Sequence, residues 1–315
     1  MSRTVLPPHD VSVVGELNSD LILYGLPPAL EPEREHLAQS LAITLGSSSA
    51  IFAHNLAAFG TRVGFVSLIG DDPLGELALG RLAAGGVDVS RVRRAGGDSK
   101  TGLTVVLPHE GFRNILTYPG TMFEMSFDDL DLEYLSSARH FHLSSFFLHR
   151  ALRPRIGDLF SRMKAAGLTT SLDTNDDPED RWDDDVLEVL RQVDVFMPNE
   201  REAIKIARAS DLDAAVDMLA ARVPVLVVKL GPAGSLVRRG AEVFRVSPVQ
   251  VEAVDPVGAG DSFDAGFINK FVAGCDLPTC ARWGNLAGAY STTSSGGTEA
   301  FQDREALSRF FAQHL

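Results

Sequence analysis

Short apolar runs rich in β-branched residues alternate along the chain with longer segments in which apolar residues recur at helical spacing. The short runs predict strands at residues 11–17, 62–70, 140–146, 168–175, 193–199 and 223–231. The longer segments predict helices at residues 47–60, 72–86, 152–167, 186–192, 200–209 and 212–223. This repeated order predicts an α/β fold: a three-layer α/β/α, doubly wound arrangement in which helices cover both faces of a mostly parallel sheet.

Two segments, residues 19–44 and 98–121, interrupt this alternation with strands that no helix separates. The second segment predicts a hairpin whose turn is His109-Glu110-Gly111. Together they predict a small β-sheet that closes as a lid over the strand ends, where open α/β sheets bind ligands. We therefore expect residues 1–315 to form a single domain with this lid.

The composition is that of a globular protein large enough for a sizeable core. Of the 315 residues, 45% are hydrophobic and 23% are charged, and the formal net charge is -13. Such a charge argues against nucleic acid or an acidic membrane surface as a partner. No apolar run reaches the roughly 18 residues of a membrane span, and the N-terminus lacks the apolar core of a signal peptide, so a soluble cytoplasmic protein is expected.

Four features that could suggest a binding or metal site are better interpreted as structural. We interpret the basic run at residues 91–97 as a solvated turn before a strand. The acidic run at residues 175–185 lacks the glycine and the terminal glutamate of a calcium loop, and it predicts a loop followed by a helix start. His140 and His142 share one face of a strand, but with no third ligand nearby they are expected to be packed or hydrogen-bonded. The two cysteines are expected to be free thiols.

The stretch DPVGAGD, residues 255–261, carries the clearest chemical signal. If a helix begins near Asp261, the amide groups of Gly258, Ala259 and Gly260 are unpaired at its positive end and can hold phosphate oxygens. A carboxylate is unfavourable beside an anion site unless it takes part in chemistry, and Asp261 could accept the proton of a hydroxyl that attacks phosphorus. From this spacing alone the alternative stays open that Asp261 caps the helix and the glycines turn the chain.

The motif resembles the C-terminal signature Asp-Thr-x-Gly-Ala-Gly-Asp of the ribokinase-like, or PfkB, carbohydrate kinase family. Other motifs of that family follow in the same order along nearly the whole chain. The resemblance implies that Asp261 is the catalytic base and that the Gly-Ala-Gly amides form an anion hole. It also implies ATP as the phosphoryl donor, Mg2+ as cofactor and, as in many members, a monovalent cation such as K+ near Asp255.

The acceptor side resembles the family in part. GELNSDLIL, residues 15–23, resembles the sugar-contacting strand, which implies that Asn18 and Asp20 bind acceptor hydroxyls. The family's Gly-Gly-x-x-x-Asn block keeps Gly46 here, but Ser47 replaces the second glycine and Ile51 replaces the asparagine. Loss of that amide removes hydrogen bonds worth on the order of 1 kcal/mol each, which puts ribose-type recognition in doubt. The alternative stays open that the hydroxyl groups of residues 47–49 compensate for it.

Two more residues complete the implied acceptor site. Asn175 matches the asparagine of a family pattern, although Asp177 stands where some sugar-acid kinases carry an arginine. Arg113, on the predicted lid hairpin, is the cation best placed to meet an anionic substrate. A solvated surface arginine is the structural alternative.

The nucleotide side resembles the family through three further motifs. NERE, which ends at Glu202, resembles the Asn-x-x-Glu motif that organises magnesium around the phosphates, although a helix start with glutamates in its first turn is the alternative. The resemblance also implies a nucleotide-binding strand and turn and an adenine-flanking helix. The implied nucleotide-binding residues are Asn199, Lys229, Gly231, Gly234, Asn285 and Ser291, and the implied metal-binding residues are Glu202 and Asp255.

These observations predict an ATP-dependent, magnesium-requiring kinase that phosphorylates a hydroxyl of a small sugar or sugar-like metabolite. The lids of two family subunits often pair, so a homodimer through the lid is expected. One alternative keeps the fold and takes a nucleoside as acceptor, as adenosine kinases do. Another is a non-catalytic metabolite sensor, against which the intact Asp261 and its glycines speak.

Overall fold

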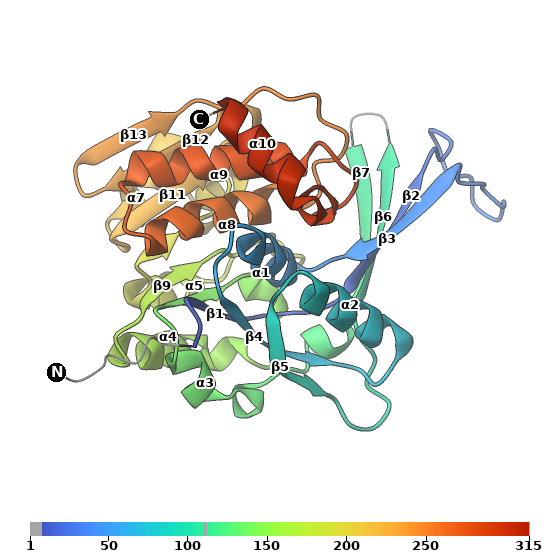
Figure 1. The fold of residues 1–315 in the computed structure, drawn as a ribbon, viewed down its shortest axis with the longest axis horizontal. Coiled ribbons are helices and arrows are strands. Elements are labelled where there is room, and N and C mark those ends of the chain that lie inside the picture. The colour runs from blue at the N-terminus through green and yellow to red at the C-terminus, as the bar shows by residue number, and fades with distance from the viewer. Residues whose placement is uncertain (1–7, 110–111, 315) are drawn as a thin grey trace.

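A computed structural model describes residues 8–109 and 112–314, and within these residues nine strands form one large sheet (Figure 1). Seven neighbouring strands are parallel, and β12 and β13 add two antiparallel strands at one edge. The order across the sheet is β13-β12-β11-β10-β9-β8-β1-β4-β5. The strands are β1 (Val11–Val14), β4 (Val63–Ile69), β5 (Asp88–Arg94), β8 (His140–Leu143), β9 (Thr169–Leu172), β10 (Val195–Phe196), β11 (Val225–Lys229), β12 (Ser235–Arg239) and β13 (Glu242–Val246).

Helices cover both faces of this sheet, so the predicted three-layer architecture is confirmed (Figure 1). One face packs against α1 (Ser48–Ala58), α2 (Pro73–Ala84), α8 (Ala259–Val272) and α9 (Leu277–Ser291), with α10 (Arg304–His314) packed on α9. The other packs against α3 (Leu132–Ser136), α4 (Ile156–Ala165), α5 (Asp185–Val189), α6 (Glu200–Ala207) and α7 (Leu212–Ala220). Short 3-10 turns occupy Gly120–Met122, Phe127–Asp129, Phe146–Leu148, Arg153–Arg155, Leu190–Gln192, Gly231–Ala233 and Glu299–Gln302.

The hydrophobic core consists of two clusters, one on each face of the sheet. Phe52 and Phe267 are fully buried on one face, and Phe141 and Phe160 on the other. Local signals set the helix ends as the sequence predicts: Asp72 accepts a hydrogen bond from the Gly75 amide at 2.9 Å, and Pro73 opens α2. These two core clusters support the loops that follow the carboxyl ends of the strands.

The two segments that interrupt the alternation form the expected second sheet, which projects from the body as shown in Figure 1. Its strands are β2 (Ser19–Tyr24), β3 (Ser40–Leu45), β6 (Leu103–His109) and β7 (Phe112–Tyr118), in the order β3-β2-β6-β7. His109 pairs with Phe112, while Glu110 and Gly111 of the predicted turn lie outside the described residues. We call this sheet the lid.

The interpretation of the basic run as a turn is wrong. Arg91, Arg93 and Arg94 belong to β5, an edge strand of the large sheet, and their side chains bond to Asp131, Asp129 and Glu76. Charged residues suit an edge strand because they discourage pairing with a further strand. The polar composition that suggested a turn thus marks the edge of the sheet.

The other structural interpretations are confirmed. Asp177 accepts hydrogen bonds from the amides of Glu179, Arg181 and Trp182, which makes the acidic run a loop that leads into α5. His140 and His142 are buried and hydrogen-bonded to Thr169, Ser171 and Ser144. Cys275 and Cys280 are free thiols. No helix in the described part of the chain is long and apolar enough to cross a membrane.

Candidate active site

The candidate site lies where the loops after four strands of the large sheet meet the start of α8. β9, β8 and β1 are adjacent and parallel, so their carboxyl ends lie at one edge of the sheet. The loop after β1 supplies Asn18, the loop after β8 supplies Ser145, and the loop after β9 supplies Asp173 and Asn175. Lys229 ends β11.

The glycine motif forms the start of α8, as the sequence predicts. Gly258 is the N-cap residue with φ 73°, and Asp261 lies in the first helical turn. A Cβ atom on Gly258 would lie 2.5 Å from the Gly297 Cα atom, so both the backbone angle and the space require glycine. The first amides of a helix have no partner within it and carry its positive end. The Ala259 amide donates to the Pro256 carbonyl oxygen at 3.3 Å, whereas the Gly258 and Gly260 amides have no backbone partner among the described residues, so these two amides support the expected anion hole.

The Asp261 carboxyl group is 8% exposed and lies close to several charges. Burial raises the pKa of Asp261 to about 7, and the negative charge of Asp173 adds to this effect. The positive charge of Lys229 and a hydrogen bond from Ser48 act in the opposite direction. A carboxylate whose pKa lies near neutral pH is well suited to accept a proton from a hydroxyl group.

Lys229 is partly buried and lies between two buried carboxylates, close to the Gly258–Gly260 backbone. Its Nζ atom donates to Asp173 Oδ2 at 2.9 Å and to Asp264 Oδ2 at 3.0 Å. Burial alone would lower the pKa of Lys229, but the two carboxylates outweigh it and raise that pKa. A Cβ atom on Gly260 would lie 3.6 Å from Nζ, so the ammonium group is close to the anion-hole backbone.

Four of the residues expected to bind the acceptor lie together at the base of the lid: Asn18, Asp20, Gly46 and Ser47. Asp20 of β2 is buried, and a Cβ atom on Gly46 would lie 2.1 Å from Asp20 Oδ1, so this approach requires glycine at position 46. Burial raises the pKa of Asp20 to about 7, helped by the charges of Asp261 and Asp255 and opposed by Arg113. This coupling places Arg113 of the lid close enough to affect the carboxylates of the site.

Ser47 occupies the place of a family glycine and keeps a glycine-like backbone. Its φ is 68°, and its hydroxyl group bonds to Asn18 Oδ1 while accepting from the Asn18 amide at 2.9 Å. Ile51 is 3% exposed and packs against Gly258 and Gly297, between α1 and the start of α8. Ile51 therefore packs against the backbone of the glycine motif, and a contact with the acceptor remains a prediction.

The residues expected at the nucleotide and the metal are positioned by their own local hydrogen bonds. Asn199 and Glu202 form a reciprocal capping box at the start of α6. Burial raises the pKa of Glu202 to about 8, and Asp173 adds to this rise. Asp255 accepts from Tyr24 Oη at 3.1 Å, from the Gly296 amide at 3.0 Å and from the Val257 amide at 3.0 Å. Gly231 and Gly234 lie in the turn between β11 and β12.

Asn285 and Ser291 are both on α9. Asn285 Nδ2 donates to the carbonyl oxygens of Val246 and Ser247 at 3.1 and 3.0 Å, so it fixes the chain that leaves β13. Ser291 is fully buried, and its hydroxyl group has no hydrogen-bond partner among the residues that the structure describes. A contact of either side chain with adenine remains a prediction.

Within residues 8–109 and 112–314, no three histidine, cysteine, aspartate or glutamate side chains are grouped as ligands of one metal ion. Mg2+ normally keeps several waters and takes one or two protein carboxylates together with phosphate oxygens. Glu202 and Asp173, which interact electrostatically near the phosphate side, fit such a sparse donor set. The Asp255 carboxylate is already held by three protein donors, so a monovalent cation there remains a prediction.

Sequence reasoning missed three residues that the structure places in or beside this site. Asp264 lies one turn after Asp261 on α8, and its i, i+3 spacing could have revealed it. Glu16 and His149 are buried together, with Glu16 Oε2 and His149 Nε2 3.4 Å apart. No sequence signal links them, because these two positions are 133 residues apart in the chain.

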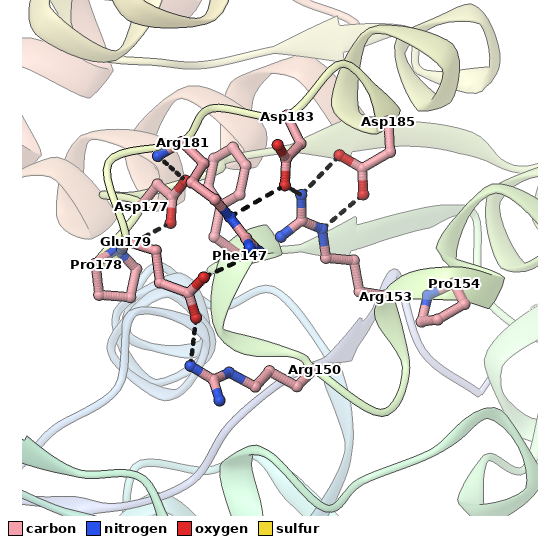
Figure 2. Close-up of a pocket in the computed structure, with 10 residues that line it drawn as sticks. All are labelled: Phe147, Arg150, Arg153, Pro154, Asp177, Pro178, Glu179, Arg181, Asp183 and Asp185. Atoms are coloured by element: carbon pink, nitrogen blue, oxygen red, sulfur yellow. Dashed lines mark hydrogen bonds and ion pairs between the residues drawn. The ribbon is translucent and has the colours of Figure 1, made fainter.

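A separate pocket of about 510 Å³ lies in the loops after β8 and β9 (Figure 2). Arg150 bonds to Glu179 at 2.5 Å and Arg153 to Asp185 at 2.6 Å, and Arg181 contacts Glu179 and Asp183. Figure 2 shows that these arginines and carboxylates point toward one another. The charges are matched within the protein, and we assign no ligand to this pocket.

Comparisons with known proteins extend the likeness to nearly the whole chain. Residues 8–304 match the pfkB family carbohydrate kinase. A fructoselysine 6-kinase of Shigella flexneri is 30% identical over 246 residues, which cover 75% of this chain and 87% of the relative. A 2-dehydro-3-deoxygluconokinase of Bacillus subtilis is 27% identical over 292 residues, which cover 88% of this chain and 89% of the relative.

Solved structures show the same architecture. A chain from E. coli described as a ribokinase II, in complex with ATP and Mg2+, superposes with a TM-score of 0.82. It is 25% identical, and the match covers 97% of this chain and 100% of that chain. The expected ribokinase-like fold, with its large sheet and smaller sheet, is confirmed. From residue 8 to residue 304 this chain belongs to the pfkB family of carbohydrate kinases, which are ATP-dependent enzymes.

Proposed function

We propose that this protein transfers the γ-phosphoryl group of ATP to a hydroxyl group of a small sugar or sugar-like metabolite, with Asp261 as the general base. The observation that carries the proposal is the position of Asp261 in the first turn of α8, next to the Gly258–Gly260 backbone. A near-neutral pKa of about 7 supports the same role.

In the proposed reaction the acceptor hydroxyl lies between Asp261 and the γ-phosphorus. Asp261 takes the hydroxyl proton, the acceptor oxygen forms a bond to the γ-phosphorus, and the bond from this phosphorus to the β–γ bridging oxygen breaks, leaving ADP. The amides of Gly258, Ala259 and Gly260 stabilise the charge on the transferring group. Asn18 and Asp20 orient the acceptor.

Glu202, with Asn199 beside it, would hold Mg2+ together with its bound waters. When bound, Mg2+ would neutralise charge on the ATP phosphates. Lys229 keeps the two carboxylates below the anion hole paired, which limits the negative charge that an incoming phosphate meets. The lid excludes water and so favours transfer over hydrolysis.

We also propose that two copies of the chain pair through their lids. Apolar side chains of β7 are exposed on both faces of this strand, among them Phe112, Ile115, Leu116 and Tyr118. An exposed apolar edge strand tends to pair unless it is covered, and a second lid offers a matching surface. Light scattering after gel filtration tests this: a dimer that Leu116→Lys dissociates supports the proposal, and a monomeric unaltered protein contradicts it.

The acceptor is tested with a panel of neutral sugars, sugar acids, amino-sugar conjugates and nucleosides. ADP release is coupled to a spectroscopic readout in the presence of ATP and Mg2+, and product mass is confirmed for each hit. Turnover on a sugar-type compound supports the proposal. Turnover on nucleosides alone would assign the protein to the other acceptor class, and binding of a sugar without any turnover would indicate a sensor.

A further inference from the structure

Glu16, in the loop after β1, is a buried carboxylate with a complete set of donors. Its side chain belongs to a residue that is 3% exposed, and Oε1 accepts from Ser145 Oγ at 2.7 Å. Oε2 accepts from Ser49 Oγ at 2.8 Å and lies 3.4 Å from His149 Nε2. Burial opposes ionisation, but His149 and Ser145 outweigh it and lower the pKa of Glu16 to about 2. Glu16 is therefore a fixed negative charge at neutral pH.

A single amide group connects this carboxylate to Asp261. Asn175 Nδ2 donates to Ser145 Oγ at 2.9 Å and also to Ser48 Oγ. An amide nitrogen has two hydrogens, so it can serve both serines at once. Each serine oxygen then accepts from Asn175, and its own hydrogen points to a carboxylate: Ser145 to Glu16 and Ser48 to Asp261.

The central hydrogen bond joins two residues with unusual backbone angles. Asn175 has φ 53° and Ser145 has φ 57°, both in the left-handed region that residues other than glycine rarely adopt. Such angles cost free energy, and they occur preferentially where the surrounding structure holds a functional group in place. Here the angles bring the two side chains within 2.9 Å of each other across the loops after β8 and β9.

We infer that Glu16 is a positioning residue for Asp261: through Ser145 and Asn175 it anchors the Ser48 hydroxyl that donates to the base, and its charge acts on the base directly. The inference rests on the proposed function, in which Asp261 is that base. An amide does not pass on protons, so the connection orients groups and does not carry the proton away from Asp261.

The two ends of the connection act on Asp261 in opposite directions. The Ser48 hydrogen bond stabilises the ionised carboxylate and lowers the pKa of Asp261, whereas the Glu16 charge repels it and raises that pKa. Asp173, Lys229 and Asp20, on three further segments, also act on or lie near Asp261, and the substitutions below leave them unchanged.

The test is an NMR titration of the protein labelled with 13C at the aspartate carboxyl carbons, without substrates, from pH 5 to pH 9. The Asp261 resonance is assigned by its loss in Asp261→Asn. We expect Ser48→Ala to raise the pKa of Asp261 by about 0.5 or more. Glu16→Gln keeps an amide oxygen that can accept from Ser145, so it preserves the anchor and removes only the charge, and we expect it to lower the pKa of Asp261 by a similar amount. Matched controls are Ser308→Ala and Glu305→Gln on α10, both exposed, which should leave it unchanged.

Shifts of the two variants in the same direction, or no shift in either, would overturn the inference. Glu16 is buried, so Glu16→Gln could impair folding; Ser145→Ala then serves instead. It frees Asn175 and Ser48 from their anchor and should raise the pKa of Asp261 less than Ser48→Ala does, and an unchanged pKa would overturn the anchoring role. The titration needs no turnover, so a lack of kinase activity would contradict the proposed function and leave this test readable.

Discussion

The Tyr24 hydroxyl group donates to Asp255 Oδ2 at 3.1 Å and so joins the lid to the loop that leads into the Gly258–Gly260 backbone. Tyr24 ends β2, and Asp255 begins the DPVGAGD stretch 231 residues later. Asp255 in turn accepts from the Val257 and Gly296 amides. The position of the lid is thereby tied to the shape of the backbone that is proposed to hold the γ-phosphate.

Tyr24→Phe should uncouple the lid from the anion hole. One hydrogen bond to a charged group is worth about 1.5 kcal/mol, so we expect kcat/KM for the acceptor to fall by about tenfold. Because the lid excludes water less well, the ratio of ATP hydrolysis to phosphoryl transfer should rise. Tyr290→Phe on α9, which removes a hydroxyl without a hydrogen bond to a described residue, is the control. Unchanged coupling in Tyr24→Phe would show that the lid does not depend on this bond.

Replacing Lys229 tests whether its ion pairs with Asp173 and Asp264 are needed for stability. Lys229→Met leaves Asp173 and Asp264 buried without their counter-charge, and we expect the free energy of unfolding to fall by about 3–5 kcal/mol. Urea unfolding at pH 7 measures this loss. Lys205→Met on the exposed side of α6 should change it by less than about 1 kcal/mol. A loss in Lys229→Met as small as in this control would contradict the account.

Gly258→Ala tests the backbone of the anion hole. The positive φ of 73° and the 2.5 Å approach to Gly297 mean that a methyl group must displace the start of α8. A displacement of the proposed phosphate cradle should lower kcat by about 100-fold, comparable to loss of an oxyanion donor. Gly80→Ala, in α2, has open space around its Cβ atom and should keep full activity. Equal activity of the two variants would argue against the cradle.

Asp20 and Asp261 should make the pH dependence of turnover unusually steep on the acid side. Each has a pKa raised to about 7, and because their negative charges repel each other, the pair loses its two protons in two coupled steps. Protonated Asp261 cannot accept a proton, so kcat/KM should fall below pH about 7, by more than tenfold per pH unit if both groups must be ionised.

Asp20→Asn tests the direction in which the charge of Asp20 shifts the pKa of Asp261. In Asp20→Asn the neighbouring negative charge is lost, so the pKa of Asp261 falls and the acid limb moves to lower pH, with a slope of about tenfold per pH unit. The pH profile of kcat/KM gives the position and the slope of the acid limb, and neither depends on the maximal value of kcat/KM. A limb that stays in place, or moves to higher pH, would contradict the proposed coupling.

The pKa of Glu16 is shifted in the opposite direction to that of Asp261, so its effect on stability has the opposite pH dependence. Its pKa is lowered from 4.5 to about 2, so its contribution to stability is complete above pH about 4.5 and is lost as the pH falls toward 2. The difference in free energy of unfolding between the unaltered protein and Glu16→Gln should be on the order of 3 kcal/mol at pH 7 and about 1 kcal/mol smaller at pH 4. Urea titrations at the two pH values measure it, and a difference that grows in acid would contradict the assignment.

Much of the fold follows from local patterns in the sequence, and the misses have specific causes. Apolar periodicity locates β1, β4 and β8 with the helices between them, and Asp72 with Pro73 marks the start of α2. β5 was missed because the charged side chains of an edge strand resemble those of a turn. Side-chain polarity alone does not distinguish the two.

The candidate site could also be predicted only in part from the sequence. Contiguous motifs such as Gly258–Asp261 and Asn199–Glu202 are visible in the sequence because one helix start contains all their parts. The set of Glu16, Ser145 and Asn175 is assembled from three loops, and the hydrogen bond between Glu16 and Ser145 spans 129 positions. Only the packing of parallel strands brings those loops to one edge of the sheet.

The central claim is that Asp261 takes the proton of the acceptor, and one substitution tests it most directly. Asp261→Asn keeps the shape of the side chain and the helix start but removes the base. With an acceptor that the unaltered protein phosphorylates, we expect kcat to fall by at least about 1,000-fold while ATP binding, measured by calorimetry, changes by less than about threefold. The matched control is Asp213→Asn on the exposed side of α7. Turnover in Asp261→Asn within tenfold of the unaltered protein would contradict the account.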